Sequence, residues 1–185
     1  MAKIILGFVG QIASGKDVSK KYLAEKYGAQ SCRFSSILRD VLTRIGVEIK
    51  RENLQKISTV LRQNFGEDLL ANAIAKDAAN FNSDIVIVDG VRRMTDIVHL
   101  NELPHFFLVK IEADPKLRYE RMKTRNENVG DAKKSYEDFL KDQDVEADKE
   151  IPAVMATAKY VLNNDGSLQD LYKQLDKLIA ELQAK

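Results

Sequence analysis

Short runs of apolar residues alternate along the chain with segments in which apolar residues repeat every three or four positions. Each run has the length of a buried strand. The runs cover residues 4–9, 31–34, 85–88, 106–111 and 160–162. The helical spacing is clearest in residues 37–45, 54–61 and 69–74. Because strands that alternate with helices build parallel sheets, the pattern predicts an α/β fold with a five-stranded parallel sheet.

A polar stretch, residues 126–150, interrupts this alternation. Most of its residues are charged or polar, and its few apolar side chains provide little surface for packing. A segment of this kind packs weakly, so we expect it to move.

The composition is that of one globular domain. The chain has 185 residues, of which 44% are apolar and 31% charged, and 29 basic residues against 28 acidic ones give a net charge of +1. This balance supplies no broad positive field, so we expect no nucleic-acid partner. The first apolar run is too short for a signal peptide or a membrane span, which predicts a cytoplasmic protein without membrane contact.

Cysteine and histidine are expected to be structural. The single cysteine, Cys32, has no partner for an internal disulfide and no Cys/His cluster around it, so we expect a small core residue. His99 and His105 lie near the ends of predicted elements without a paired acid or nucleophile, which favours structural roles for both.

Residues 10–17 read GQIASGKD and match the phosphate-binding pattern G-x-x-x-x-G-K-[ST] except at its last position. The segment follows an apolar strand and precedes a helical pattern, as the motif requires. Glycines let backbone N–H groups curl around a phosphate, the helix N-terminus adds positive charge, and the lysine reaches the terminal phosphates. The alternative is an ordinary turn before a helix. The predicted nucleotide-binding residues are Gly10, Gln11, Ile12, Ala13, Ser14, Gly15, Lys16, Asp17 and Val18.

Asp17 stands where the pattern has a hydroxyl that normally binds Mg²⁺. A carboxylate is also a hard oxygen ligand, but it adds negative charge beside the phosphates. Asp17 therefore binds the metal directly or through water, or it only favours the positive first turn of the helix while Ser19 or another group takes the metal. We favour a metal role for Asp17.

A second acid, Asp89, ends an apolar run in the sequence IVIVDGVRR. In open parallel sheets ligands lie beyond the carboxyl ends of strands, so Asp89 would face the phosphates and hold a metal-bound water. The alternative is a turn aspartate before Gly90. Arg92 and Arg93 follow in a loop, where a guanidinium can clamp a phosphate with two hydrogen bonds.

Three arginines, Arg118, Arg121 and Arg125, fall on much the same face of the helix predicted in RYERMKTR. The preceding strand brings this helix to the sheet edge that also carries the glycine-rich segment. Cations that share a face repel one another, which favours an anionic ligand over partial neutralisation by Glu120 and Asp114 on a solvated surface.

In this order the motifs resemble the P-loop nucleoside-monophosphate-kinase-like superfamily, especially the adenylate-kinase-related and dephospho-CoA-kinase-like proteins. The resemblance covers nearly the whole chain. It rests on GQIASGKD, FSSILR at 34–39, DGVRR at 89–93, RYERMKTR at 118–125, the polar stretch and YVLNNDGSLQDL at 160–171. It implies a three-layer α/β/α P-loop NTPase fold, residues 1–185, with a helical acceptor-binding region at about 35–82 and a lid at about 126–150.

The resemblance also implies roles for single residues. On the acceptor side, FSSILR would place Ser36 and Arg39 at the acceptor's phosphate, and either Arg92 or Arg93 would be a second clamp. On the donor side ATP and Mg²⁺ would bind. The implied catalytic residues are Lys16, Asp89, Arg121 and Arg125, the implied metal ligands are Asp17 and Asp89, and the loop that wraps the adenine would contain Asn163, Asp165 and Gly166.

The acceptor can be predicted from the end of the second strand. A kinase that acts on a hydroxyl benefits from a carboxylate base there, whereas a nucleotide phosphate is already anionic and needs none. The strand runs into Phe34, Ser35 and Ser36, and no acid stands among them. We therefore predict transfer of the γ-phosphoryl group of ATP·Mg²⁺ to a nucleoside or deoxynucleoside monophosphate. The first alternative is a dephospho-CoA-kinase-like small-molecule kinase.

Two further alternatives come from the lid. It has no arginine after Arg125, and its cations are Lys133, Lys134, Lys141 and Lys149. Lysine cannot fork onto two phosphate oxygens, so lid closure would be weaker than in the family. The chain would then be a nucleotide-binding regulator or a slow NTPase. A last alternative, which does not depend on the lid, is a non-enzymatic module that only binds phosphate.

Overall fold

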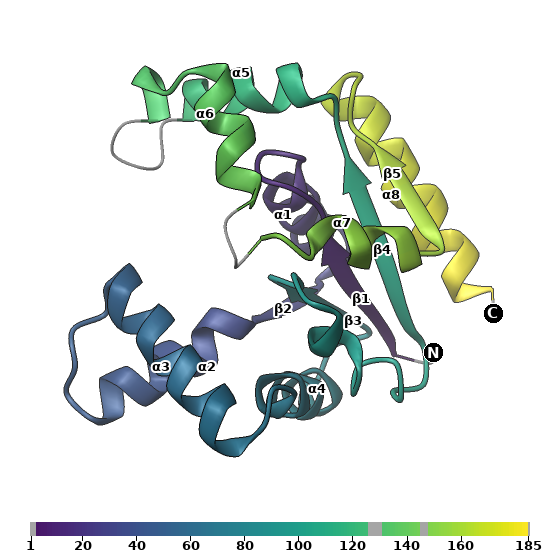
Figure 1. Ribbon diagram of the computed structural model, residues 1–185. Coiled ribbons are helices and arrows are strands. Elements are labelled where there is room, and N and C mark those ends of the chain that lie inside the picture. Colours follow the sequence, from purple (N-terminus) through teal and green to yellow (C-terminus); the bar gives the residue numbers. More distant parts are fainter. Residues whose placement is uncertain (1–2, 126–130, 145–147, 185) are drawn as a thin grey trace.

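A five-stranded parallel sheet forms the centre of the computed structural model, which describes residues 3–125, 131–144 and 148–184 (Figure 1). The strands lie in the order β2-β3-β1-β4-β5 and all neighbouring strands are parallel. Their bounds are β1 (Ile4–Val9), β2 (Gln30–Arg33), β3 (Ile85–Asp89), β4 (Phe106–Glu112) and β5 (Tyr160–Asn163). The predicted α/β class and the parallel sheet are confirmed. One boundary differs, because Phe34 begins a helix and does not end the second strand.

Helices connect the strands. Their bounds are α1 (Lys16–Tyr27), α2 (Phe34–Arg44), α3 (Arg51–Phe65), α4 (Leu69–Asn80), α5 (Pro115–Arg125), α6 (Tyr136–Lys141), α7 (Ile151–Thr157) and α8 (Leu168–Gln183). Short 3-10 turns are η1 (Met94–Ile97), η2 (Asp131–Lys133) and η3 (Asp142–Asp144). The sequence explains where α8 begins. Ser167 and Asp170 form a reciprocal capping box there, and the apolar stripe of the helix follows it.

The two faces of the sheet are covered by different helices. Every residue of β1 and β3 is buried, as expected for strands with helices on both faces. On one face Leu6 packs with Leu23 of α1 and Leu171 of α8. On the other face Ile5 packs with Ile74 of α4 and with α7. The implied three layers, helices on each side of one sheet, are therefore present.

The two regions that the resemblance implies lie apart. Figure 1 shows α2, α3 and α4 gathered at one end of the molecule and α5 and α6 at another. Parts of the predicted lid, residues 126–130 and 145–147, lie outside the described residues. The division into an acceptor-binding region and a lid stays a prediction. No helix in the described part of the chain is long and apolar enough to cross a membrane.

Candidate functional site

The loop of residues 10–15, here called the glycine-rich loop, connects β1 to α1 and has no room for side chains at two points. A Cβ atom at Gly10 would lie 2.4 Å from the carbonyl oxygen of Ile111, and one at Gly15 would lie 2.3 Å from the amide nitrogen of the Asn164 side chain. Gly15 also has a φ of +112°, and Ala13 a φ of +59°. Glycine adopts such positive φ values without steric cost, which explains Gly15 in this turn. The strand, loop and helix required by the motif are present.

A buried asparagine holds the glycine-rich loop from below. The Asn164 side chain donates a 2.8 Å hydrogen bond to the carbonyl oxygen of Ser14, and its backbone N–H donates one of 2.8 Å to Glu112. Sequence reasoning missed Asn164 and named its neighbours instead. The available signal was the alternation along β5: Asn164 follows buried Leu162 by two positions and so points to the same side.

Lys16 begins α1 and folds back over the glycine-rich loop. Its Nζ donates hydrogen bonds to the carbonyl oxygens of Gly10 at 2.5 Å and Gln11 at 3.1 Å. Burial lowers the pKa of the Lys16 ammonium to about 8, and this effect outweighs the opposing charges of Asp89 and Asp17. The lysine is therefore already positioned on the loop that the motif assigns to phosphate.

The two acids predicted beside the phosphates share two basic partners. The Oδ2 atom of Asp89, which is almost fully buried, accepts hydrogen bonds from Lys20 Nζ at 2.8 Å and from Arg33 Nε and Nη2 at 2.9 and 2.6 Å. The exposed Asp17 has its Oδ1 3.2 Å from Lys20 Nζ and 3.6 Å from Arg33 Nη2, while its Oδ2 lies 3.5 Å from Arg125 Nη1. Burial alone would raise the pKa of Asp89, but the hydrogen bonds from Lys20 and Arg33 keep it below its ordinary value.

Sequence reasoning missed Lys20 and Arg33, although both left a signal. Lys20 is one helical turn after Asp17, on the same face of α1. Arg33 is the last residue of β2 and is paired in register with Asp89, the last residue of β3. The second strand ends on a cation, and this cation pairs with the acid that ends the next strand.

The chemistry of Asp17 and Asp89 suits a hard divalent cation, since Mg²⁺ prefers carboxylate oxygens. The described residues contain no group of three or more His, Cys, Asp or Glu side chains that could hold a metal ion. A metal at this place would therefore depend on these two carboxylates together with phosphate oxygens and water.

The three arginines of α5 do not share one environment. Arg118 is 2% exposed and donates to the carbonyl oxygens of Ala113 at 3.1 Å and Ile12 at 3.4 Å and to Gln143 Oε1 at 3.1 Å. The expectation that it joins the others on a ligand-facing surface is wrong, because tertiary packing encloses it. Arg121 is half-buried, and its Nη1 atom has no hydrogen-bond partner within the described residues.

Gln143 connects the second half of the predicted lid to the glycine-rich loop. Its Oε1 atom accepts hydrogen bonds from Gln11 Nε2 at 2.6 Å and from Arg118. The Arg118 guanidinium also lies over the Phe139 ring, 5.5 Å from its centroid. Because Phe139 is buried, this part of the lid packs against α5 and the loop.

The arginines predicted for the acceptor contact carboxylates or solvent. Arg39 is exposed on α2, with no hydrogen bond or ion pair in the described part of the chain. Arg92 Nη1 lies 3.1 Å from Asp148, and Arg93 Nη1 lies 3.8 Å from Glu67. Neither arginine of the DGVRR segment makes a hydrogen bond or ion pair with Asp89 or Lys16 in the described part of the chain, but Arg92 is near enough to Lys16 for its charge to help lower the pKa of that lysine. Ser36 lines a groove of about 440 Å³ beside β2, together with Arg33.

The loop after β5 is tied to the start of α5. The Asn163 side chain donates to Asp165 Oδ2 at 2.8 Å, and Asp165 Oδ1 accepts a 2.6 Å hydrogen bond from the backbone N–H of Asp114. Gly166 lies next to Asp170, which forms the capping box of α8 with the N-cap residue Ser167. The loop predicted to wrap adenine therefore lies close to the helix that carries Arg121.

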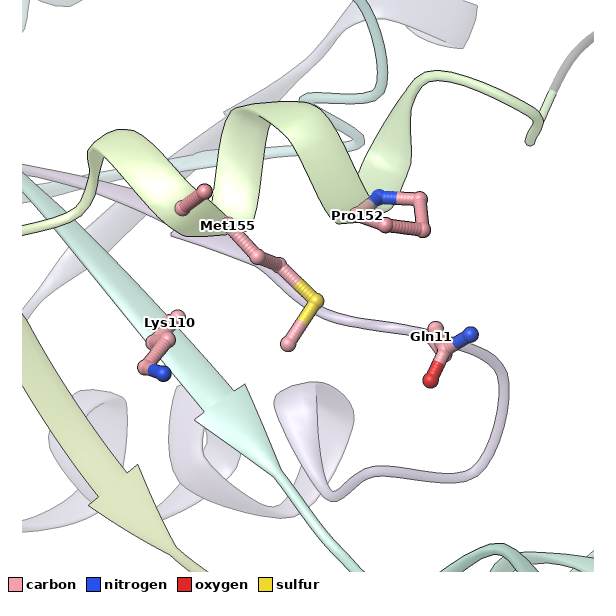
Figure 2. Close-up of a pocket in the computed structure, with 5 residues that line it drawn as sticks. Gln11, Lys110, Pro152 and Met155 are labelled. Atoms are coloured by element: carbon pink, nitrogen blue, oxygen red, sulfur yellow. The ribbon is translucent and has the colours of Figure 1, made fainter.

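A second, smaller pocket lies beside the glycine-rich loop. It has a volume of about 290 Å³, and Figure 2 shows Met155 and Pro152 of α7 facing Lys110 of β4 and the side chain of Gln11. Among the residues that line this pocket, Gln11 alone belongs to the glycine-rich loop. The pocket thus borders the loop at its first residues and does not cover Lys16 or the acids.

Two expectations for cysteine and histidine have different outcomes. Cys32 is a free, buried thiol whose pKa is raised to about 12 by burial, as expected for a core residue. The expectation that His99 lacks a paired acid is wrong: its ring nitrogens lie 2.8 Å from Asp68 Oδ2 and 3.4 Å from Glu102 Oε2. Asp68 lies 31 positions away, so sequence proximity could not reveal the pair.

Comparison with known proteins places the chain in a family. Residues 9–139 match a family model described as an AAA domain. The UPF0200 protein TK1334 of Thermococcus kodakarensis is 32% identical, and the alignment covers 100% of both chains. The chain belongs to the AAA domain family and to the UPF0200 proteins.

Solved structures extend the comparison to the fold of this AAA domain protein. A shikimate kinase from Bacteroides thetaiotaomicron superposes with a TM-score of 0.62 at 15% identity, covering 97% of this chain and 98% of its own. The shikimate kinase from Acinetobacter baumannii in complex with shikimate gives 0.58 at 18% identity, covering 99% and 96%. These matches show a P-loop kinase-like fold, which confirms the fold that the resemblance implies.

Proposed function

We propose that the protein is an ATP-dependent kinase that transfers the γ-phosphoryl group of ATP to a nucleoside or deoxynucleoside monophosphate. The observation that carries the proposal is the convergence of basic side chains on the start of α1. Lys16 lies on the glycine-rich loop, and Arg125 reaches Asp17 at 3.5 Å from the far end of α5. Positioned cations at a helix N-terminus are the means by which kinases neutralise transferring phosphates.

On the donor side, the glycine-rich loop and Lys16 would hold the β- and γ-phosphates. Arg121 and Arg125 would hold the donor phosphates and stack on the adenine, next to the loop of Asn163 to Gly166. Asp17 and Asp89 are the carboxylates available to Mg²⁺, which would have to displace Lys20 and Arg33 from Asp17 Oδ1 and Asp89 Oδ2 to reach these two oxygens. When bound, this ion neutralises charge on the phosphate oxygens. Lys16 donates hydrogen bonds to two loop carbonyls in the structure, so it can transfer these donors to phosphate oxygens without moving α1.

On the acceptor side, Arg39, Ser36 and Arg92 or Arg93 would bind the monophosphate. A phosphate acceptor is favoured because the second strand ends on a cation, Arg33, whose guanidinium pairs with Asp89 and cannot remove a proton from a hydroxyl. In-line transfer then depends on positioning and charge neutralisation rather than on a general base.

The test is a panel of nucleoside monophosphates, dephospho-CoA and shikimate, each incubated with ATP and Mg²⁺, with products separated by charge. We expect a phosphorylated nucleotide with the parent protein and none with Lys16→Ala. The matched control is Lys21→Ala, which removes an exposed lysine from the same helix. The far-UV circular dichroism of all three proteins should coincide. A Lys16→Ala protein as active as the parent would exclude the loop from catalysis.

A slow NTPase or nucleotide-binding regulator is the second candidate. It is favoured by the absence of an arginine after Arg125 in the lid sequence and by the pairing of Lys134 with Asp142. In this case ATP would be lost without any phosphorylated acceptor in the same panel. Phosphorylation of dephospho-CoA alone would instead select the small-molecule kinase.

A further inference from the structure

The side chain of Lys20 lies between the two carboxylates to which the proposed function assigns Mg²⁺. Its Nζ atom is 2.8 Å from Asp89 Oδ2 and 3.2 Å from Asp17 Oδ1, and Arg33 contacts the same two oxygens. The side chain of Lys20 is only 22% exposed, against 76% for its neighbour Lys21. The side chain of Lys20 is therefore fixed by its two ion pairs, whereas that of Lys21 is largely surrounded by solvent.

These contacts already occupy one of the two carboxylate oxygens of Asp89. Its Oδ2 atom already accepts three N–H donors, one from Lys20 and two from Arg33. Mg²⁺ binds carboxylate oxygens at about 2.0–2.1 Å and keeps a strict octahedron, so it would have to replace these hydrogen bonds at the oxygen. Both hydrogen-bond donors are positively charged, which makes the exchange harder.

The charges explain why the two basic residues are present. In the motif a neutral hydroxyl follows the lysine, whereas here Asp17 adds a negative charge beside Asp89. Two carboxylates next to a polyphosphate would repel it. Lys20 and Arg33 cancel both charges from within the protein, at distances of 2.6–3.6 Å.

We infer that Lys20, together with Arg33, is the resident counter-cation of the Asp17–Asp89 pair, so that the glycine-rich loop binds a nucleotide polyphosphate without a divalent cation. The inference rests on the proposed function, because it requires that this loop binds phosphates. It assigns Lys20 as the residue that determines whether nucleotide binding depends on Mg²⁺.

The experiment is calorimetric titration with ADP, in EDTA and in excess Mg²⁺. The parent should bind ADP with affinities that agree within about threefold in the two conditions. Lys20→Met keeps the aliphatic stem and removes one positive charge from the carboxylate pair, while Arg33 stays in contact with both acids. We expect its metal-free affinity to fall by about tenfold or more and to recover in Mg²⁺.

The control variants separate charge from structure. Lys20→Arg keeps the charge and should behave like the parent, and Lys21→Met should leave the ratio of the two affinities unchanged. Lys20→Gln, which keeps a donor without the charge, repeats the test if the methionine variant does not fold. A parent that loses more than about threefold in EDTA, or a Lys20→Met protein with the parent's ratio, overturns the inference.

The outcomes distinguish this inference from the proposed function. If ADP binds equally with and without Mg²⁺ but no acceptor is ever phosphorylated, the kinase proposal fails and the counter-cation stands. If nucleotides are phosphorylated but ADP binding requires Mg²⁺, the counter-cation fails alone. If ADP does not bind under either condition, both are wrong.

Discussion

At the scale of single residues, a buried amide decides where the glycine-rich loop sits. Asn164 is 3% exposed and donates to Ser14, while Gly15 gives it room that any Cβ atom would fill. The two positions are complementary. The loop can approach Asn164 closely only because residue 15 has no side chain and because the Asn164 amide donates a hydrogen bond to the loop. The neighbouring Asn163 is exposed and bonds to Asp165 at the surface.

Asn164→Ala should therefore lower both stability and nucleotide affinity. Removing the amide leaves the buried Ser14 carbonyl without its donor, which costs about 1–3 kcal/mol of unfolding free energy. Urea denaturation measures this loss, and calorimetry with ADP measures the accompanying weakening. Asn163→Ala is the matched control and should change the unfolding free energy by less than about 0.5 kcal/mol. Equal effects of the two substitutions would contradict the anchoring role of Asn164.

At the scale of elements, a buried ion pair joins α3 to the loop after β3. Arg62 Nη2 donates to Asp96 Oδ1 at 3.0 Å, and Asp96 Oδ2 accepts the backbone N–H groups of Arg92 and Arg93, each at 3.0 Å. Arg62 also donates to the carbonyl oxygen of Glu67. Through one carboxylate the helical region thus fixes the backbone of both candidate acceptor arginines.

Asp96→Ala should destabilise the protein strongly, because it leaves the Arg62 guanidinium buried without its charged partner. Breaking such a pair costs about 3–5 kcal/mol, and the double variant Arg62→Met/Asp96→Ala should recover part of the loss. Urea denaturation of the four proteins of this cycle gives the coupling. For contrast, Glu25→Ala breaks the exposed 3.8 Å pair with Lys21. It should cost less than about 1 kcal/mol. A cost for Asp96→Ala as small as this would contradict the buried pair.

A second contact between elements is sensitive to pH. His99 lies between Asp68, at the start of α4, and Glu102, and the hydrogen bond from Asp68 followed by that from Glu102 raises the pKa of the imidazole above its ordinary value of 6.5. The folded protein therefore binds the proton more tightly than the unfolded chain does. Its contribution to stability is complete below pH 6.5 and is lost as the pH rises through the folded-state pKa.

His99→Gln should remove this pH dependence. The difference in unfolding free energy between parent and variant should be largest near pH 6 and shrink as the pH rises toward 8 and beyond. Urea titrations of both proteins across this range measure the difference directly. A difference that grows with pH would show that the imidazole is held in its neutral form.

At the scale of the whole molecule, the sequence predicts what depends on neighbours along the chain and misses what depends on neighbours in space. The continuous apolar runs predict the parallel strands, and the GQIASGKD pattern predicts the loop before α1. Helical spacing puts Arg118 on the face of Arg121, but it cannot reveal that Gln143 and Phe139 cover Arg118. Arg33 was missed for the same reason, because its role follows from the register of β2 against β3. The contact of Lys20 with Asp17 is local, but its contact with Asp89, 69 positions away, is not.

The overall charge predicts how the molecule selects among polyanions. With 29 basic and 28 acidic residues, attraction for phosphates must come from a local site and not from a broad field. A compact anion such as inorganic tripolyphosphate fits the glycine-rich loop, whereas an oligonucleotide needs a basic surface along its length. Comparing the two ligands therefore distinguishes a local phosphate-binding site from a nucleic-acid-binding surface.

Tripolyphosphate at about 100 times its Kd should stabilise the protein by about 2.7 kcal/mol, which raises the Tm by about 5–10 °C for a chain of this size. A twenty-nucleotide single strand at 0.15 M salt, at the same total phosphate concentration, should not raise it. Lys16→Ala should abolish most of the shift, and Lys21→Ala should keep it. A ligand raises the Tm only when it binds the folded state more tightly than the unfolded chain. A Tm that rises with the oligonucleotide would therefore contradict the prediction and indicate a basic surface on the protein.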